Sequence, residues 1–104
     1  MRQLAAIMFV DMAGYTALMQ ENEKLAKAKQ KHLKDVLDST TAAHNGKILQ
    51  FNGDGAHSIF SSAVDGVNCA VEIQKQLQQE PKVELRIGLH TGDISIEDGT
   101  IYGD

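Results

Sequence analysis

The sequence is poor in residues that cross-link or stiffen a small protein. Its 104 residues include one cysteine, one proline, no tryptophan, two tyrosines and three phenylalanines. Because one cysteine cannot form an internal disulfide, the chain depends on its hydrophobic core and suits a reducing compartment, so we expect a cytoplasmic protein. With 42% apolar residues, a chain of this length supports a single domain, which we expect to span residues 1–104.

Long hydrophobic runs and an excess of positive charge are also absent. The longest apolar run, Leu4 to Val10, has seven residues, whereas a membrane-spanning helix needs about 20, so we expect no membrane span. Fourteen acidic residues against ten basic ones give a net charge of −4, which is the wrong sign for binding a nucleic-acid backbone or an anionic membrane. An anionic small ligand would therefore need a metal ion or backbone N–H groups.

The first half of the chain predicts a strand, two helices and a hairpin. Residues 4–10 are continuously apolar, which is typical of a central strand covered on both faces. Residues 15–19 and 21–44 show helical spacing, and Asn45-Gly46 predicts the end of the second helix. Two short strands, residues 47–52 and 56–60, then flank Gly53-Asp54-Gly55, a cluster that favours a hairpin turn.

The second half predicts one more helix and further strands. Ser62 with Asp65 resembles a capping box, and the helix after it would bury a stripe of four apolar residues, Val64, Val67, Val71 and Leu77. Residues 83–90 alternate as a half-buried strand, and residues 94–96 can pair with residues 101–102. The order β-α-α-β-β-α-β-β predicts an α+β, ferredoxin-like sandwich with its helices on one face of an antiparallel sheet.

Two aspartates stand where the pattern does not otherwise favour a charge. Asp11 directly follows the apolar run, and Asp54 lies between two glycines at the hairpin turn. In a ferredoxin-like order the first strand neighbours this hairpin, so the two carboxylates would converge. Like charges a few ångströms apart repel unless a proton or a cation lies between them, and oxygen ligands suit Mg²⁺ or Mn²⁺ together with substrate phosphates. For each aspartate taken alone, a structural role in a cap or turn is the better explanation, but that role explains the convergence of both less easily.

Four motifs in this order resemble the catalytic domain of class III adenylate/guanylate cyclases. They are FVDMAGYT, GKILQFNGDG with the Ile59-Phe60 strand end, LRIGLHTGDI, and IYGD, and they extend over nearly the whole chain. The resemblance implies a cyclase-like fold that is incomplete at its C-terminus, because the family continues beyond the last motif. It also implies a homodimer with active sites at the interface, converting a nucleoside triphosphate to a 3′,5′-cyclic monophosphate and pyrophosphate.

The resemblance also implies roles for particular residues. Asp11 and Asp54 would bind two Mg²⁺ or Mn²⁺ ions per site, with the backbone carbonyl of Met12 as a further ligand. The triphosphate would be wrapped by main-chain donors of Ala13, Gly14, Tyr15 and Thr16. The base-reading positions would be Gln50 and Thr100. Glutamine matches neither the lysine of many adenylyl enzymes nor the glutamate of guanylyl enzymes, while threonine occurs in some bacterial members, which favours ATP over GTP.

A second departure concerns the reaction itself. The family's transition-state asparagine and arginine lie in a helix just beyond the Ile-Tyr-Gly-Asp motif, and the sequence here ends at Asp104. We therefore expect these 104 residues alone to bind metal but to turn over little or no substrate. The alternative is a non-catalytic, cyclase-like module for dimerisation or nucleotide sensing. A diguanylate cyclase fits less well, because its Gly-Gly-Asp/Glu-Glu-Phe hairpin is missing.

Overall fold

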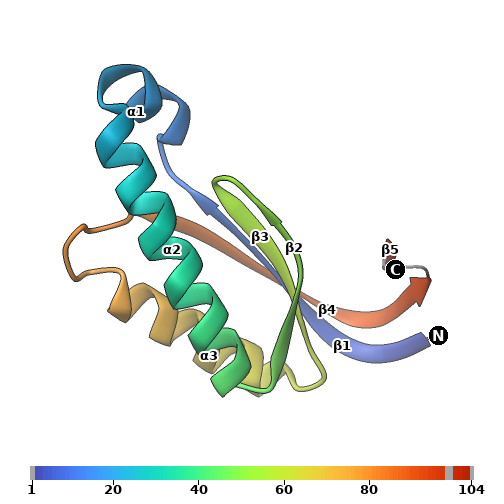
Figure 1. Cartoon of the computed structure of the whole chain (residues 1–104). Coiled ribbons are helices and arrows are strands. Elements are labelled where there is room, and N and C mark those ends of the chain that lie inside the picture. The colour runs from blue at the N-terminus through green and yellow to red at the C-terminus, as the bar shows by residue number, and fades with distance from the viewer. Residues whose placement is uncertain (1, 98–99, 104) are drawn as a thin grey trace.

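The computed structural model describes the backbone of residues 2–97 and 100–103 and the side chains of residues 4–93. Its elements, in chain order, are β1 (Arg2–Met12), α1 (Tyr15–Glu21), α2 (Glu23–Ala43), β2 (Gly46–Asn52), β3 (Gly55–Phe60), α3 (Ala63–Gln76), β4 (Leu85–Glu97) and β5 (Thr100–Gly103). Figure 1 shows α2 and α3 together on one side of the sheet. The element order and the single helical layer are those predicted from the sequence.

The strands form one antiparallel sheet in the order β2-β3-β1-β4-β5. β1 is central, between β3 and β4, as its apolar run predicted. The two strands expected at residues 83–90 and 94–96 are one continuous strand, β4, because β1 pairs with it along its length from Arg2 to Met12. β5 pairs with the end of β4, Ile96 opposite Ile101, as expected. The turn expected at residues 98–99 lies outside the described residues.

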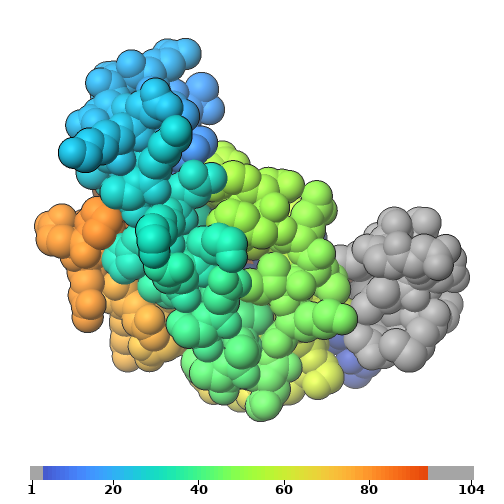
Figure 2. All heavy atoms as spheres, viewed as in Figure 1, coloured from blue at the N-terminus to red at the C-terminus, as the bar shows by residue number. Residues whose placement is uncertain are grey.

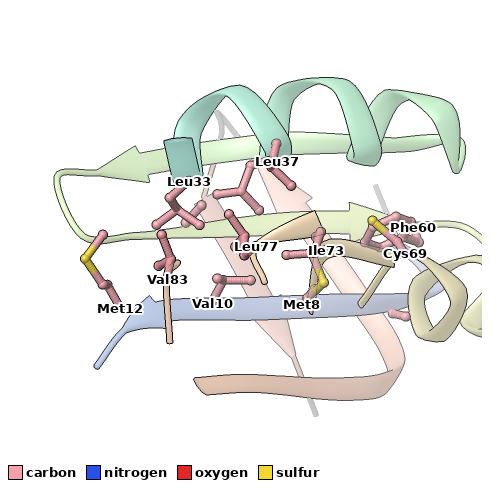
Figure 3. Packing of buried hydrophobic residues seen from close by; sticks show 13 residues of the cluster. Met8, Val10, Met12, Leu33, Leu37, Phe60, Cys69, Ile73, Leu77 and Val83 are labelled. Atoms are coloured by element: carbon pink, nitrogen blue, oxygen red, sulfur yellow. The ribbon is translucent and has the colours of Figure 1, made fainter. Parts of the chain in front are cut away.

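The hydrophobic core lies between the sheet and the two long helices. In Figure 3, Leu33 and Leu37 point from α2 toward the sheet, while Met8 and Val10 point from β1 toward the helices. Cys69 of α3 is buried in this core, and burial raises the pKa of its thiol. Because successive side chains of a strand alternate between its two faces, Phe9, which lies between Met8 and Val10 on β1, points to the face of the sheet without helices.

The apolar stripe predicted for α3 is wrong in three of its four positions. Val64, Val67 and Val71 are 67%, 50% and 49% exposed, and only Leu77 is buried. The helix buries Gly66, Cys69 and Ile73 instead. Gly66 lies on this packed face, where a Cβ atom would make ordinary van der Waals contacts of 3.5 to 3.6 Å with side chains of Phe60, Leu89 and Ala6.

The long helical segment is divided at Asn22, whose side-chain oxygen accepts a hydrogen bond from the Leu25 amide (3.1 Å) and caps α2. The helical spacing of residues 21–44 includes Leu25 and Ala43 among its apolar positions, but both are exposed, and Ala26, Thr40 and Thr41 are buried. α2 ends as predicted, because Asn45 adopts the left-handed conformation with φ 62°. Three lysines of α2 form ion pairs with acidic residues one turn away along its exposed face, Lys27 with Glu23, Lys31 with Asp35 and Lys34 with Asp38.

The molecule is elongated, with principal extents of 43 × 24 × 17 Å. Figure 2 shows α1 and the first turns of α2 projecting at one end, beyond the sheet. The sequence predicted that β1 is covered on both faces. This is wrong for part of the strand, because Leu4 and Phe9 are exposed. Within the described residues, no helix combines the length and the apolar character needed to cross a bilayer.

Candidate active site

Asp11 and Asp54 come from neighbouring elements at one edge of the sheet. Asp11 is the second-last residue of β1 and lies opposite Gly55 of β3. Asp54 is in the turn between β2 and β3, and its backbone carbonyl accepts a hydrogen bond from the Met12 amide (2.7 Å). The structure therefore places the first strand beside the hairpin, as the ferredoxin-like order predicted.

Gly55 is what allows this close approach. A Cβ atom at that position would collide with the backbone carbonyl of Val10 and lie 3.3 Å from the Cβ of Asp11. Only glycine lets the hairpin turn approach β1 this closely, and the turn carries Asp54 with it.

Both aspartates line one open pocket of about 620 Å³ on the face of the sheet without helices. Val10 and Met12 point into the helical core, so the alternation of β1 directs Asp11 and Phe9 to this opposite face. Phe9 and His57 meet edge to face beside the aspartates, with ring centroids 4.9 Å apart. The pocket thus has carboxylates at one end and an aromatic pair in its wall.

A basic residue that the sequence analysis did not single out lies against Asp11. Arg86 of β4 is opposite Asp11 in the register. Its Nε donates to Oδ1 of Asp11 at 2.9 Å and its Nη2 donates to Oδ2 at 3.2 Å. The sequence pattern placed Arg86 only on the polar side of a half-buried strand. Arg86 lies opposite Asp11 because β4 lies beside β1. The ferredoxin-like strand order is the only signal in the sequence that suggests this neighbour.

The segment after Asp11 forms the turn into α1. The Ala13 amide donates to the carbonyl of Glu84 (2.9 Å), so this N–H is not available to a ligand. Gly14 caps α1 with a left-handed φ of 71° and with no side-chain hydrogen bond to the first turn. The amides of Tyr15 and Thr16 belong to that first turn, where a helix has no backbone partner for its N–H groups.

The two expected base-reading residues lie apart from the pocket. Gln50 is exposed on β2 next to a register shift, and its amide donates to Asn52 Oδ1 (3.2 Å). Thr100 is the first residue of β5 and pairs with Glu97. The structure brings Asp11 and Asp54 together, whereas Gln50 is not among the residues that line the pocket.

The donor set at the pocket suits a hard divalent cation. Two carboxylates and nearby backbone oxygens are ligands that Mg²⁺ and Mn²⁺ accept, with water and substrate oxygens completing the shell. No group of three or more histidine, cysteine, aspartate or glutamate side chains gathers at one point among the described residues. A closed, all-protein site of the zinc type is therefore not formed in this part of the chain.

Comparison with known proteins gives a consistent family. No protein-family model matches the sequence. A solved structure of an adenylate/guanylate cyclase/hydrolase from Silicibacter pomeroyi superimposes with a TM-score of 0.86 at 39% identity, covering 100% of this chain and 65% of that one. "Putative adenylate cyclase 3" of Rhizobium meliloti (strain 1021) is 35% identical over 111 residues, which is 99% of this chain and 19% of that protein.

A more distant structure shares the fold. The adenylyl cyclase CyaB from P. aeruginosa superimposes with a TM-score of 0.79 at 20% identity and is covered to 65% of its length. The fold is therefore that of a nucleotide cyclase domain. The chain belongs to the class III adenylate/guanylate cyclases and represents part of such a domain.

Proposed function

We propose that residues 1–104 form the metal- and triphosphate-binding part of a class III cyclase site that converts ATP, in preference to GTP, to the 3′,5′-cyclic monophosphate and pyrophosphate. The observation that carries this proposal is the meeting of Asp11 and Asp54 on one open pocket. A cap at a strand end would explain Asp11 alone, and a hairpin tip would explain Asp54 alone. Neither explains why both carboxylates line the same pocket.

Asp11 and Asp54 would hold the cations, with the Met12 carbonyl as a further ligand. When bound, two divalent ions supply Lewis acidity at the ribose 3′-hydroxyl and α-phosphate and neutralise the charge of the leaving pyrophosphate. The protein's own part is to present anionic oxygens from a rigid strand and a glycine-flanked turn. The chain needs no nucleophile of its own, because the attacking group belongs to the substrate.

The turn into α1 would meet the phosphates. With the Ala13 amide bonded to Glu84, the donors left from the predicted set are the N–H groups of Gly14, Tyr15 and Thr16. Backbone donors of this kind bind phosphate without adding net positive charge, which fits a chain of net charge −4.

The purine would be read by a second copy of the chain. Gln50 is not among the described residues that line the pocket, and the backbone of Thr100 pairs with Glu97, at the other end of β4 from Arg86, as expected if a homodimer builds each site from both subunits. The amide of Gln50 both donates and accepts hydrogen bonds, so it can pair with the edge of either purine. Threonine at residue 100 is the basis for favouring ATP.

The proposal is tested by titrating Mn²⁺ and a non-hydrolysable ATP analogue into the wild-type chain and into Asp11→Asn and Asp54→Asn. We expect each substitution to weaken Mn²⁺ binding roughly tenfold or more, because each removes a charged ligand. Asp38→Asn is the matched control: it removes the same charge from an exposed carboxylate that pairs with Lys34 on α2.

Two results would count against the cyclase proposal. Mn²⁺ affinity that neither pocket substitution changes would leave the alternative, a non-catalytic cyclase-like module, as the better description. An equal effect of Asp38→Asn would show that net charge governs binding instead of the pocket.

A further inference from the structure

One of the two pocket aspartates, Asp11, forms an ion pair with a basic side chain of the protein. Arg86 holds both carboxylate oxygens of Asp11, with N···O distances of 2.9 and 3.2 Å. The Asp54 carboxylate, in contrast, has no hydrogen bond or ion pair with the described residues. Of the two carboxylates of the proposed metal site, Asp11 is therefore paired with a positive charge among the described residues, and Asp54 is not.

The Arg86–Asp11 pair differs from the lysine ion pairs of α2. Those of Lys27, Lys31 and Lys34 lie along α2 and join residues four apart on one helix. The Arg86 pair joins β4 to β1, 75 residues apart in sequence, and faces the pocket. Its geometry is bidentate, which occupies the oxygen atoms that a metal ion would use.

The pair is also easily broken. The side chain of Arg86 is 74% exposed and that of Asp11 is 51% exposed. Exposed ion pairs stabilise a fold little, because water and salt screen them and because two side chains lose freedom in forming them. The guanidinium can therefore leave Asp11 without loss of the fold, and the adjoining pocket gives it room to move.

We propose that Arg86 competes with the divalent cation for Asp11, so that the metal binds this carboxylate only as the guanidinium leaves it. The proposal rests on the proposed function, which makes Asp11 a metal ligand. Two cations cannot share the same pair of carboxylate oxygens at contact distance, because they repel one another and need the same lone pairs. Arg86 is thus a positioning residue that sets the metal affinity of the site.

The test measures Mn²⁺ binding to the 104-residue chain without nucleotide, by electron paramagnetic resonance of the free ion. We expect Arg86→Gln to bind Mn²⁺ roughly 2- to 5-fold more tightly than the wild type, because the metal no longer has to displace an exposed ion pair from Asp11. Lys47→Gln is the control. It removes the same charge from an exposed residue that pairs with Ile59, toward the opposite end of the hairpin from Asp54.

A double-mutant comparison separates the exchange from a general charge effect. In an Asp11→Asn background, Arg86→Gln should no longer raise the affinity, because the carboxylate for which the two cations compete is gone. An unchanged or weakened affinity in Arg86→Gln, with Mn²⁺ binding still sensitive to Asp11→Asn, would overturn the exchange and leave the metal site intact. Binding that is insensitive to Asp11→Asn would overturn both. Circular dichroism verifies that each variant is folded.

A second measurement follows the guanidinium directly. In a titration with diamagnetic Mg²⁺, the Nε–H resonance of Arg86 should shift with the same midpoint as metal binding, because this group loses its carboxylate acceptor. The shift should be absent in Asp11→Asn. A resonance that stays fixed while Mg²⁺ binds at Asp11 would contradict the exchange.

Discussion

Single glycines decide how closely neighbouring parts of this protein approach. Gly46 begins β2 directly beside the ring of Phe60, and a Cβ atom at this position would overlap that ring. Phe60 is buried in the core, so its ring has little room to move away. Gly55 plays the same part next to Asp11 and Asp54, where the collision would be with the Val10 carbonyl.

We therefore expect Gly46→Ala to destabilise the fold by about 1 to 3 kcal/mol, the usual cost of forcing extra volume into a packed core. Gly88→Ala is the matched control, since Gly88 is also in a strand but a Cβ atom there would meet nothing within 4 Å. It should leave stability unchanged or raise it by up to about 1 kcal/mol, because alanine loses less backbone freedom on folding. Urea denaturation of both variants measures the difference, and equal midpoints would contradict the packing argument.

The helix α3 shows how an element can be predicted correctly while its buried face is not. Ser62 caps it as expected, its oxygen accepting from the Asp65 amide (3.2 Å). The valines repeat at intervals of three and four residues, and so do the residues that are actually buried, Gly66, Cys69, Ile73 and Leu77. Two stripes with the same period cannot be distinguished by periodicity. Only the contacts with the rest of the fold distinguish them: Cys69, Ile73 and Leu77 are fully buried, whereas the three valines are about half exposed or more.

This assignment can be tested with two aliphatic residues two positions apart. Ile73→Ala should cost about 2 to 5 kcal/mol of unfolding free energy, because the side chain is fully buried and leaves a cavity. Val71→Ala should cost less than about 1 kcal/mol, since Val71 is half exposed. Thermal or urea unfolding compares the two. A larger effect at Val71 would mean that the valine stripe is buried after all.

At the scale of the whole molecule, the chain carries part of a larger domain. It spans 65% of the Silicibacter pomeroyi structure and 19% of the Rhizobium meliloti protein. The described pocket holds the acidic residues proposed to bind metal. The asparagine and arginine of the family's transition-state helix would follow the Ile101-Tyr102-Gly103-Asp104 motif.

For this reason we expect purified residues 1–104, given Mn²⁺ and ATP or GTP, to form cyclic nucleotide at least about a hundredfold more slowly than a complete cyclase domain. Loss of even one preorganised transition-state donor usually costs that much. Mass spectrometry of the nucleotide products measures the rate, with the complete Silicibacter pomeroyi protein as the comparison. A rate normal for an enzyme from the 104-residue chain would refute the expectation.

Sequence patterns alone predicted the order of elements, the central place of the first strand, the hairpin with Asp54 at its turn, and the caps at Asn45 and Ser62. These depend on local chemistry: unbroken apolar runs, glycine in turns and side-chain oxygens at helix ends. The face of α3 that packs and the pairing of Arg86 with Asp11 were decided only by the tertiary structure. Both depend on which elements lie side by side and in what register. Residues 11 and 86 are far apart in the sequence, and no local pattern at either position predicts that they pair.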